Sequence, residues 1–132
     1  MNKFYNYFNV RDLTKLFLNE DVYELSKFAT ISYIGFLFLI PIFLNMHKKS
    51  KYILFHVNQG FNLFLIELFI FVVLSILNSI FVMIIGHTPL FISLTNFICY
   101  LLIVVLMLVS IVNTINGKSI RLPLIGKYKF IK

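Results

Sequence analysis

The chain has 132 residues, of which 60% are hydrophobic and only 13% are charged, and its formal net charge is +7. A water-soluble domain of this size cannot bury so much apolar surface, so the composition excludes an ordinary soluble fold and favours an integral membrane protein. The positive charges flank apolar segments, where anionic lipid headgroups explain them better than nucleic acid does. We therefore expect membrane lipid as a partner and no nucleic acid.

Residues 1–27 are predicted to form an N-terminal amphipathic lead-in helix that lies at headgroup level. Apolar side chains such as Phe4 and Phe8 are interspersed there with charged ones, as in interfacial helices. A partly disordered tail is the alternative. Asn19, followed by two acidic residues, indicates a helix start near residue 20 that continues into the next segment.

Three apolar segments, 28–47, 60–86 and 89–115, are each long enough to cross a bilayer, which takes roughly 20 residues. Backbone groups in lipid must be satisfied internally, so we predict an all-α integral membrane fold with three transmembrane helices. Residues 28–132 form this membrane domain, which ends in a basic C-terminal tail.

Local signals place the ends of these helices. Pro41 should bend the first span because it lacks an N–H group. Gly86 should end the second span, Thr88 should cap the third and Pro89 should be its first residue. The short connection predicts an antiparallel hairpin, and Asn116 with the following glycine should close its second arm. Tyrosines, including Tyr33, are expected as anchors at the membrane interface.

The distribution of Lys and Arg predicts the orientation. With three spans, eight of these residues lie in the 48–59 connection and the tail, against four before residue 28. Because cytoplasmic segments are enriched in Lys and Arg, we expect a multi-pass plasma-membrane protein with its N-terminus outside and its C-terminus in the cytoplasm.

Glu67 is the only charged residue between Lys51 and Lys118, and an ionisable group at membrane depth usually faces a helix interface, a cavity or a partner. Ser75, Asn78 and Asn96 are polar residues on the same predicted hairpin. Together with Glu67 they form a candidate intramembrane polar or partner site. Hydrogen bonds between helices, contact with a partner or a hydrated path would each explain it.

The sequence contains no pattern that predicts catalysis. His47, His56 and His87 lack the spacing of metal ligands, and no phosphate-binding loop or nucleophile motif occurs. Cys99 is interpreted as a small apolar filler. We therefore predict a non-enzymatic protein with no cofactor and no metal.

Two motifs at the ends of the predicted hairpin resemble a known family. The segment from Tyr52 to Asn62, YILFHVNQGFN, resembles the FHxxQxxN-like entry of a family of small bacterial membrane proteins, and the segment from Ile115 to Lys127, INGKSIRLPLIGK, resembles its exit. That family is related to the twenty-kilodalton Tic subunit of the chloroplast inner-envelope import machinery. The resemblance implies a helical membrane protein related to protein-translocation components.

Polar residues from both motifs form a second candidate site, a cluster on the predicted cytoplasmic face. Its members are His56, Asn58, Gln59, Asn62 and Arg121. Their side chains can donate and accept hydrogen bonds, so we expect them to clamp the tail against the start of the second span. A lipid headgroup or a partner protein is the alternative occupant.

These observations predict an accessory or translocation-type module that acts within a homo-oligomer or a larger membrane complex. The alternative is a self-protection (immunity) protein against a membrane-acting peptide or bacteriocin, since small, basic, apolar chains also suit that role.

Overall fold

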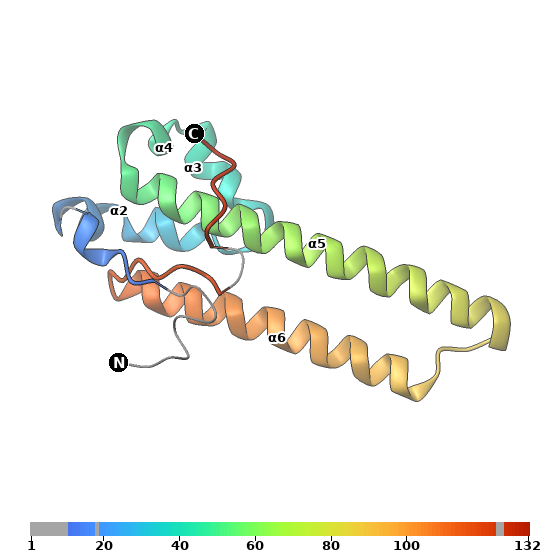
Figure 1. The fold of residues 1–132 in the computed structure, drawn as a ribbon. Helices are drawn as coiled ribbons and strands as arrows, with labels where there is room; N and C mark the ends of the chain where they lie inside the picture. The colour runs from blue at the N-terminus through green and yellow to red at the C-terminus, as the bar shows by residue number, and fades with distance from the viewer. Residues whose placement is uncertain (1–10, 18, 124–125) are drawn as a thin grey trace.

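The computed structural model describes residues 11–17, 19–123 and 126–132, and all of its regular secondary structure in these residues is helical (Figure 1). In chain order the elements are η1 (Thr14–Leu16), α2 (Asn19–Ile31), η2 (Gly35–Phe38), α3 (Leu39–Phe43), α4 (Met46–Lys49), α5 (Lys51–Ile85) and α6 (Leu90–Ile115). The all-helical class predicted from the sequence is confirmed.

A long antiparallel hairpin of α5 and α6 dominates the structure (Figure 1). Gly86 ends α5 in the left-handed conformation, with φ of 83°, as predicted. Pro89 differs from the prediction: it precedes the first residue of α6 in an extended conformation, and the helix has no side-chain cap. The ring centroids of Phe81 and Phe91 lie 5.6 Å apart, and this contact joins the two arms near the tip.

The predicted end of the second arm is also confirmed. The N–H of Gly117 donates to the carbonyl of Thr114, and the N–H of Lys118 donates to the carbonyl of Asn113. Gly117 has a φ of 70°, so these bonds form the left-handed closure that a glycine allows after a helix.

Residues 28–47, predicted as the first membrane span, do not form one helix, so the third span is not confirmed. They are divided among the end of α2, η2, α3 and α4. Gly35 and Asn45 have positive φ angles of 50° and 54°, and Pro41 lies in the short helix α3 without an N–H to donate. The breaks leave no piece near the roughly 20 residues that a crossing needs. The apolar composition of this segment matches that of a span, but its backbone turns several times and does not form one continuous helix.

We call the described residues of 11–63 and 114–132 the head, because they pack together at one end of the hairpin (Figure 1). One buried cluster joins Ala29 of α2 to Tyr52, Ile53 and Val57 of α5. Another consists of Tyr33, Leu63 and Leu122, with partly buried side chains of α6 packed against it. The predicted boundary at residue 27 lies inside α2. The predicted lead-in helix is not confirmed, because residues 1–10 lie outside the described residues and residues 11–17 contain only the short η1.

A glycine allows the closest approach in the head. A Cβ atom at Gly60 would lie 1.7 Å from the carbonyl oxygen of Ser32, so the segment after α2 packs directly on the backbone of α5. This contact brings Tyr33 to the face of α5 that carries His56.

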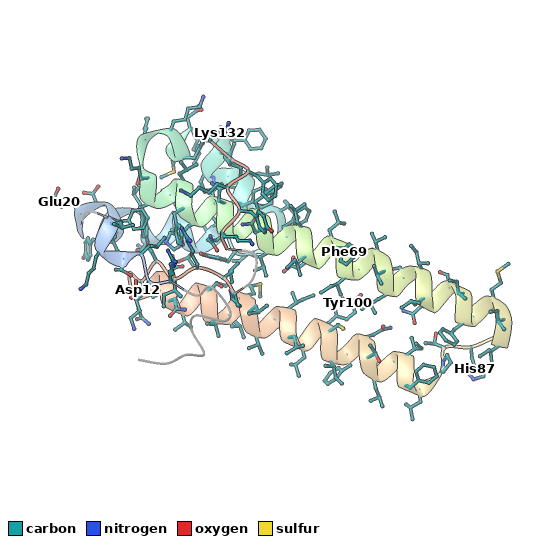
Figure 2. All side chains as sticks on the ribbon, in the orientation of Figure 1. Asp12, Glu20, Phe69, His87, Tyr100 and Lys132 are labelled. Atoms are coloured by element: carbon teal, nitrogen blue, oxygen red, sulfur yellow. The ribbon has the colours of Figure 1, made fainter. Side chains whose placement is uncertain are left out.

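Outside the head the two arms expose their apolar side chains (Figure 2). Phe69 is 69% exposed and Met83, near the tip, is 89% exposed. Residues 64–85 of α5 rise about 33 Å, close to the roughly 30 Å of bilayer hydrocarbon. Both α5 and α6 are thus long and apolar enough to cross a membrane, and little of either apolar stretch is buried by the rest of the chain.

Candidate functional site

The start of α5 carries four buried polar side chains, whose exposed fractions are 1% for His56, 3% for Asn58, 2% for Gln59 and 3% for Asn62. They occupy consecutive turns of one helix and face the tail, α6 and the segment after α2. A buried polar group costs free energy unless it is hydrogen-bonded, so its partners define what the site does.

Gln59 binds the tail through both ends of its amide. Its Nε2 donates to the carbonyl oxygen of Gly126 at 2.8 Å, and its Oε1 accepts from the N–H of Leu122 at 3.0 Å. A Cβ atom at position 126 would lie 2.6 Å from that Oε1, so only a glycine allows this approach. Gln59 therefore holds two points of the tail backbone.

Two asparagines hold the rest of the tail. The Nδ2 of Asn58 donates to the carbonyl of Ile131 at 3.0 Å, and its Oδ1 accepts from the N–H of the same residue at 2.8 Å. The Nδ2 of Asn62 donates to the carbonyl of Tyr128 at 3.0 Å. We call Asn58, Gln59 and Asn62 the tail clamp. It binds backbone groups, so it depends on the extended path of the tail more than on the tail's side chains.

His56 lies at the meeting point of four segments. Its Nδ1 is 2.8 Å from the hydroxyl of Tyr33 and 3.4 Å from that of Thr114, and its Nε2 is 3.3 Å from the hydroxyl of Ser119. Burial raises the pKa of the Tyr33 hydroxyl, which therefore stays protonated and can donate to the imidazole. The imidazole thus links α5 to the end of α6, to the start of the tail and to the segment after α2.

Arg121 is the fifth residue of the predicted cluster, and its backbone binds the segment before η1 rather than α5. Its N–H donates to the carbonyl of Arg11 at 3.0 Å, beside the isolated bridge between Asp12 and Ile120. Its half-buried side chain lines a cavity next to Asn58 and Gln59. The expected clamping of the tail against α5 is therefore present as hydrogen bonds, and these come from amides.

Asn78 and Asn96 lie on the facing arms of the hairpin. Counted from the Phe81–Phe91 contact at about 1.5 Å per residue, their heights differ by only about 3 Å. The Oδ1 atoms of both are buried and have no hydrogen-bond partner among the described residues. Ser75 is half-buried, and its carbonyl accepts from the hydroxyl of Ser79 at 2.8 Å.

Glu67 does not lie with these residues. It is half-buried, between Leu63 and Leu74, which are both buried on the face toward α6. It lies about 16 Å along α5 from Asn78 but only about 6 Å from Leu63, at the base of the exposed arms. The predicted intramembrane site is therefore divided into a carboxylate near the head and an amide pair nearer the tip.

Sequence reasoning missed the partners of His56. Tyr33 was expected at the membrane interface, yet it is 2% exposed and contacts the imidazole. Ser119 carried no signal, because its role depends on the tail folding back. Thr114 had a weak signal, since its position on the polar side of the last turn of α6 is consistent with a contact to a neighbouring helix.

The described residues contain no group of three or more His, Cys, Asp or Glu side chains that could hold a metal ion. Cys99 is a half-buried free thiol.

Comparison with known proteins gives no match: neither a family model, nor a curated protein, nor a solved structure matches the chain. The class of protein is defined by the fold alone. It is an all-helical protein with two helices capable of spanning a membrane and a polar head at their base.

Proposed function

We propose that this chain is an integral membrane protein in which α5 and α6 cross the bilayer as a hairpin and carry a basic head at the cytoplasmic face. The observation that carries the proposal is the position of its charges. All 12 Lys and Arg residues lie at or before Lys51 or at or after Lys118, so a two-span hairpin places every one of them on the same side.

This arrangement places both ends of the chain in the cytoplasm and only the tip outside. The prediction of an external N-terminus depended on residues 28–47 crossing the bilayer. The breaks at Gly35, Pro41 and Asn45 favour an interfacial position for that segment instead, where its exposed Phe36 and Phe43 would contact lipid. The three-span arrangement is the alternative that the same experiment tests.

Cysteine labelling in intact cells tests the topology. In a Cys99→Ser background, single cysteines replace Tyr23 in the head, His87 at the tip or Lys132 in the tail, all of which are exposed. A membrane-impermeant maleimide should label only position 87 until the cells are permeabilised. Labelling of positions 23 and 87 but not 132 from outside would establish the three-span arrangement, and labelling of positions 23 and 132 but not 87 would reverse the orientation.

We further propose that the hairpin acts as a non-enzymatic accessory module in a larger membrane complex. Its support is that the buried amide oxygens of Asn78 and Asn96 have no hydrogen-bond partner among the described residues, and a donor from another helix would satisfy them where the arms part to admit it. Two kinds of complex are candidates. The Tic-like resemblance implies a complex for protein translocation, and the alternative is a complex that protects the cell from a membrane-acting peptide.

Crosslinking in native membranes tests this role and distinguishes the two. A photoreactive residue in place of Phe69 or Leu102, both exposed on the arms, should capture a second copy or one recurrent membrane protein. The same residue in place of Tyr23 in the head is the control. A secretion component would favour translocation, whereas capture that occurs only when the peptide is present would favour immunity. Capture of lipid alone from both arms would refute the accessory role.

A further inference from the structure

A cavity of about 530 Å³ opens in the head beside the tail clamp, between the segment around η1, the start of α5 and the tail. Three cations from separate parts of the chain line it: Lys51 at the first turn of α5, and Arg121 and Lys129 in the tail. Its volume is in the range of small-molecule sites.

The charge of this cavity is not balanced by acids. The described residues that line it include no Asp or Glu. Asp12, close in sequence to the η1 side of the cavity, accepts hydrogen bonds from the N–H and the hydroxyl of Thr14. Like charges on residues that line one cavity favour an anion, and one guanidinium with two ammonium groups is a donor set that suits a phosphate.

The remaining wall is apolar and open. Leu16 lines the cavity although it is 73% exposed, and the rings of Phe17 and Phe55, 5.7 Å apart, lie next to it. A free phosphate would use none of this surface, whereas an amphiphile uses both the cations and the apolar wall.

We infer that this cavity binds one anionic phospholipid. The phosphate lies against Lys51, Arg121 and Lys129, and the start of an acyl chain covers Leu16 and the two rings. The inference rests on the proposed function, since the head must lie at the membrane surface for a lipid to enter. Because the cavity joins the tail to α5, the bound lipid also holds the tail clamp closed.

Lipid titration of the purified full-length chain in a non-ionic detergent, followed by native mass spectrometry, tests the site. The wild type should retain one phosphatidylglycerol and much less phosphatidylcholine. The variant Lys51→Gln, Arg121→Gln, Lys129→Gln should bind phosphatidylglycerol roughly a hundredfold more weakly, because each of the three cations near an anionic lipid contributes about a factor of five. A matched control, Lys48→Gln, Lys49→Gln, Lys132→Gln, removes three exposed charges that do not line the cavity and should bind as the wild type does.

Leu16→Gln is a second variant whose exposed position leaves the fold intact, and it should also weaken phosphatidylglycerol binding. Inorganic phosphate in large excess should not displace the lipid, and its displacement of the lipid would assign the cavity to free phosphate. The inference would be overturned if the control triple variant lost phosphatidylglycerol binding as much as the cavity triple variant, or if the cavity triple variant bound it as the wild type does. Cysteine labelling of the same variants separates failure of the lipid site from failure of the proposed topology. If only the lipid site is wrong, the impermeant maleimide still labels only position 87 at the tip.

Discussion

Gly60→Ala tests the contact on which the head depends. The added Cβ would lie 1.7 Å from the carbonyl oxygen of Ser32, and ordinary contact begins at 3.4 Å, so the two backbones must separate by about 1.7 Å. Tyr33 follows Ser32 directly and would move with it. Its hydroxyl would then leave the 2.8 Å contact with His56.

The expected cost can be worked from these changes. Overpacking costs about 1–3 kcal/mol, and a buried polar group that loses its partner costs a further 1–3 kcal/mol or so. Alanine gains about 1 kcal/mol over glycine inside a helix. The net loss in the free energy of unfolding is therefore about 1–5 kcal/mol, which lowers Tm by roughly 4 °C per kcal/mol in a chain of this size.

Thermal melting followed by circular dichroism in detergent measures this loss, and trypsin cleavage at Lys27 reports whether α2 stays docked. Gly86→Ala is the control: it makes the same chemical change at the tip, where nothing lies within 4 Å, so its strain stays far from the head. Trypsin should cleave the Gly60 variant faster and the Gly86 variant at the wild-type rate. If Gly60→Ala melts at or above the wild-type temperature, the segment after α2 does not pack on α5.

Three further predictions concern the tail clamp, the hairpin and pH. Gln59→Glu places a carboxylate oxygen where the amide nitrogen now lies, 2.8 Å from the carbonyl oxygen of Gly126. The tail should therefore bind α5 more weakly by about 1–3 kcal/mol, and carboxypeptidase should digest it faster. An unchanged digestion rate would contradict the clamp. Asn78→Leu should leave Tm unchanged or raise it in the purified monomer, because the buried Oδ1 has no partner among the described residues, whereas a large drop in Tm would reveal a partner within the chain. Hydrogen bonds from Thr14 hold the pKa of Asp12 below its usual range near pH 4, so the carboxylate stabilises the head above that pH and loses this effect as the pH falls through the lowered pKa. The melting temperatures of the wild type and Asp12→Asn should therefore differ at neutral pH and converge in acid, and a difference that grows in acid would contradict this sign.

The hairpin could be predicted because its signals are local. Gly86 and Gly117 each adopt the positive φ that a glycine permits after a helix, and each stands directly beside a long apolar run. The break-up of residues 28–47 could not be predicted in the same way. Its apolar side chains match those of a true span, and the decisive turns include a left-handed Asn45, which an asparagine adopts only in some contexts.

The tail clamp could be predicted in part. Asn58, Gln59 and Asn62 follow one another on a helix whose start must be polar, and the tail had to return to the same side as that start. Their partners in the tail lie 63 to 73 residues away, and nothing in the sequence specifies which backbone groups they reach. Tyr33 was missed because an aromatic ring with a hydroxyl suits a lipid interface and a buried imidazole equally well.

The hairpin beyond Glu67 is uncharged, and this bears on how the chain would enter a bilayer. Residues 68–117 contain no Lys, Arg, Asp or Glu, and the connection at the tip is only a few residues long. Carrying one such charge to the bilayer centre costs about 2.5–3.5 kcal/mol, and this segment carries none. In the proposed topology, insertion as a preformed pair of helices, tip first, would move no formal charge across the hydrocarbon and would leave the head in the compartment where the ribosome made it.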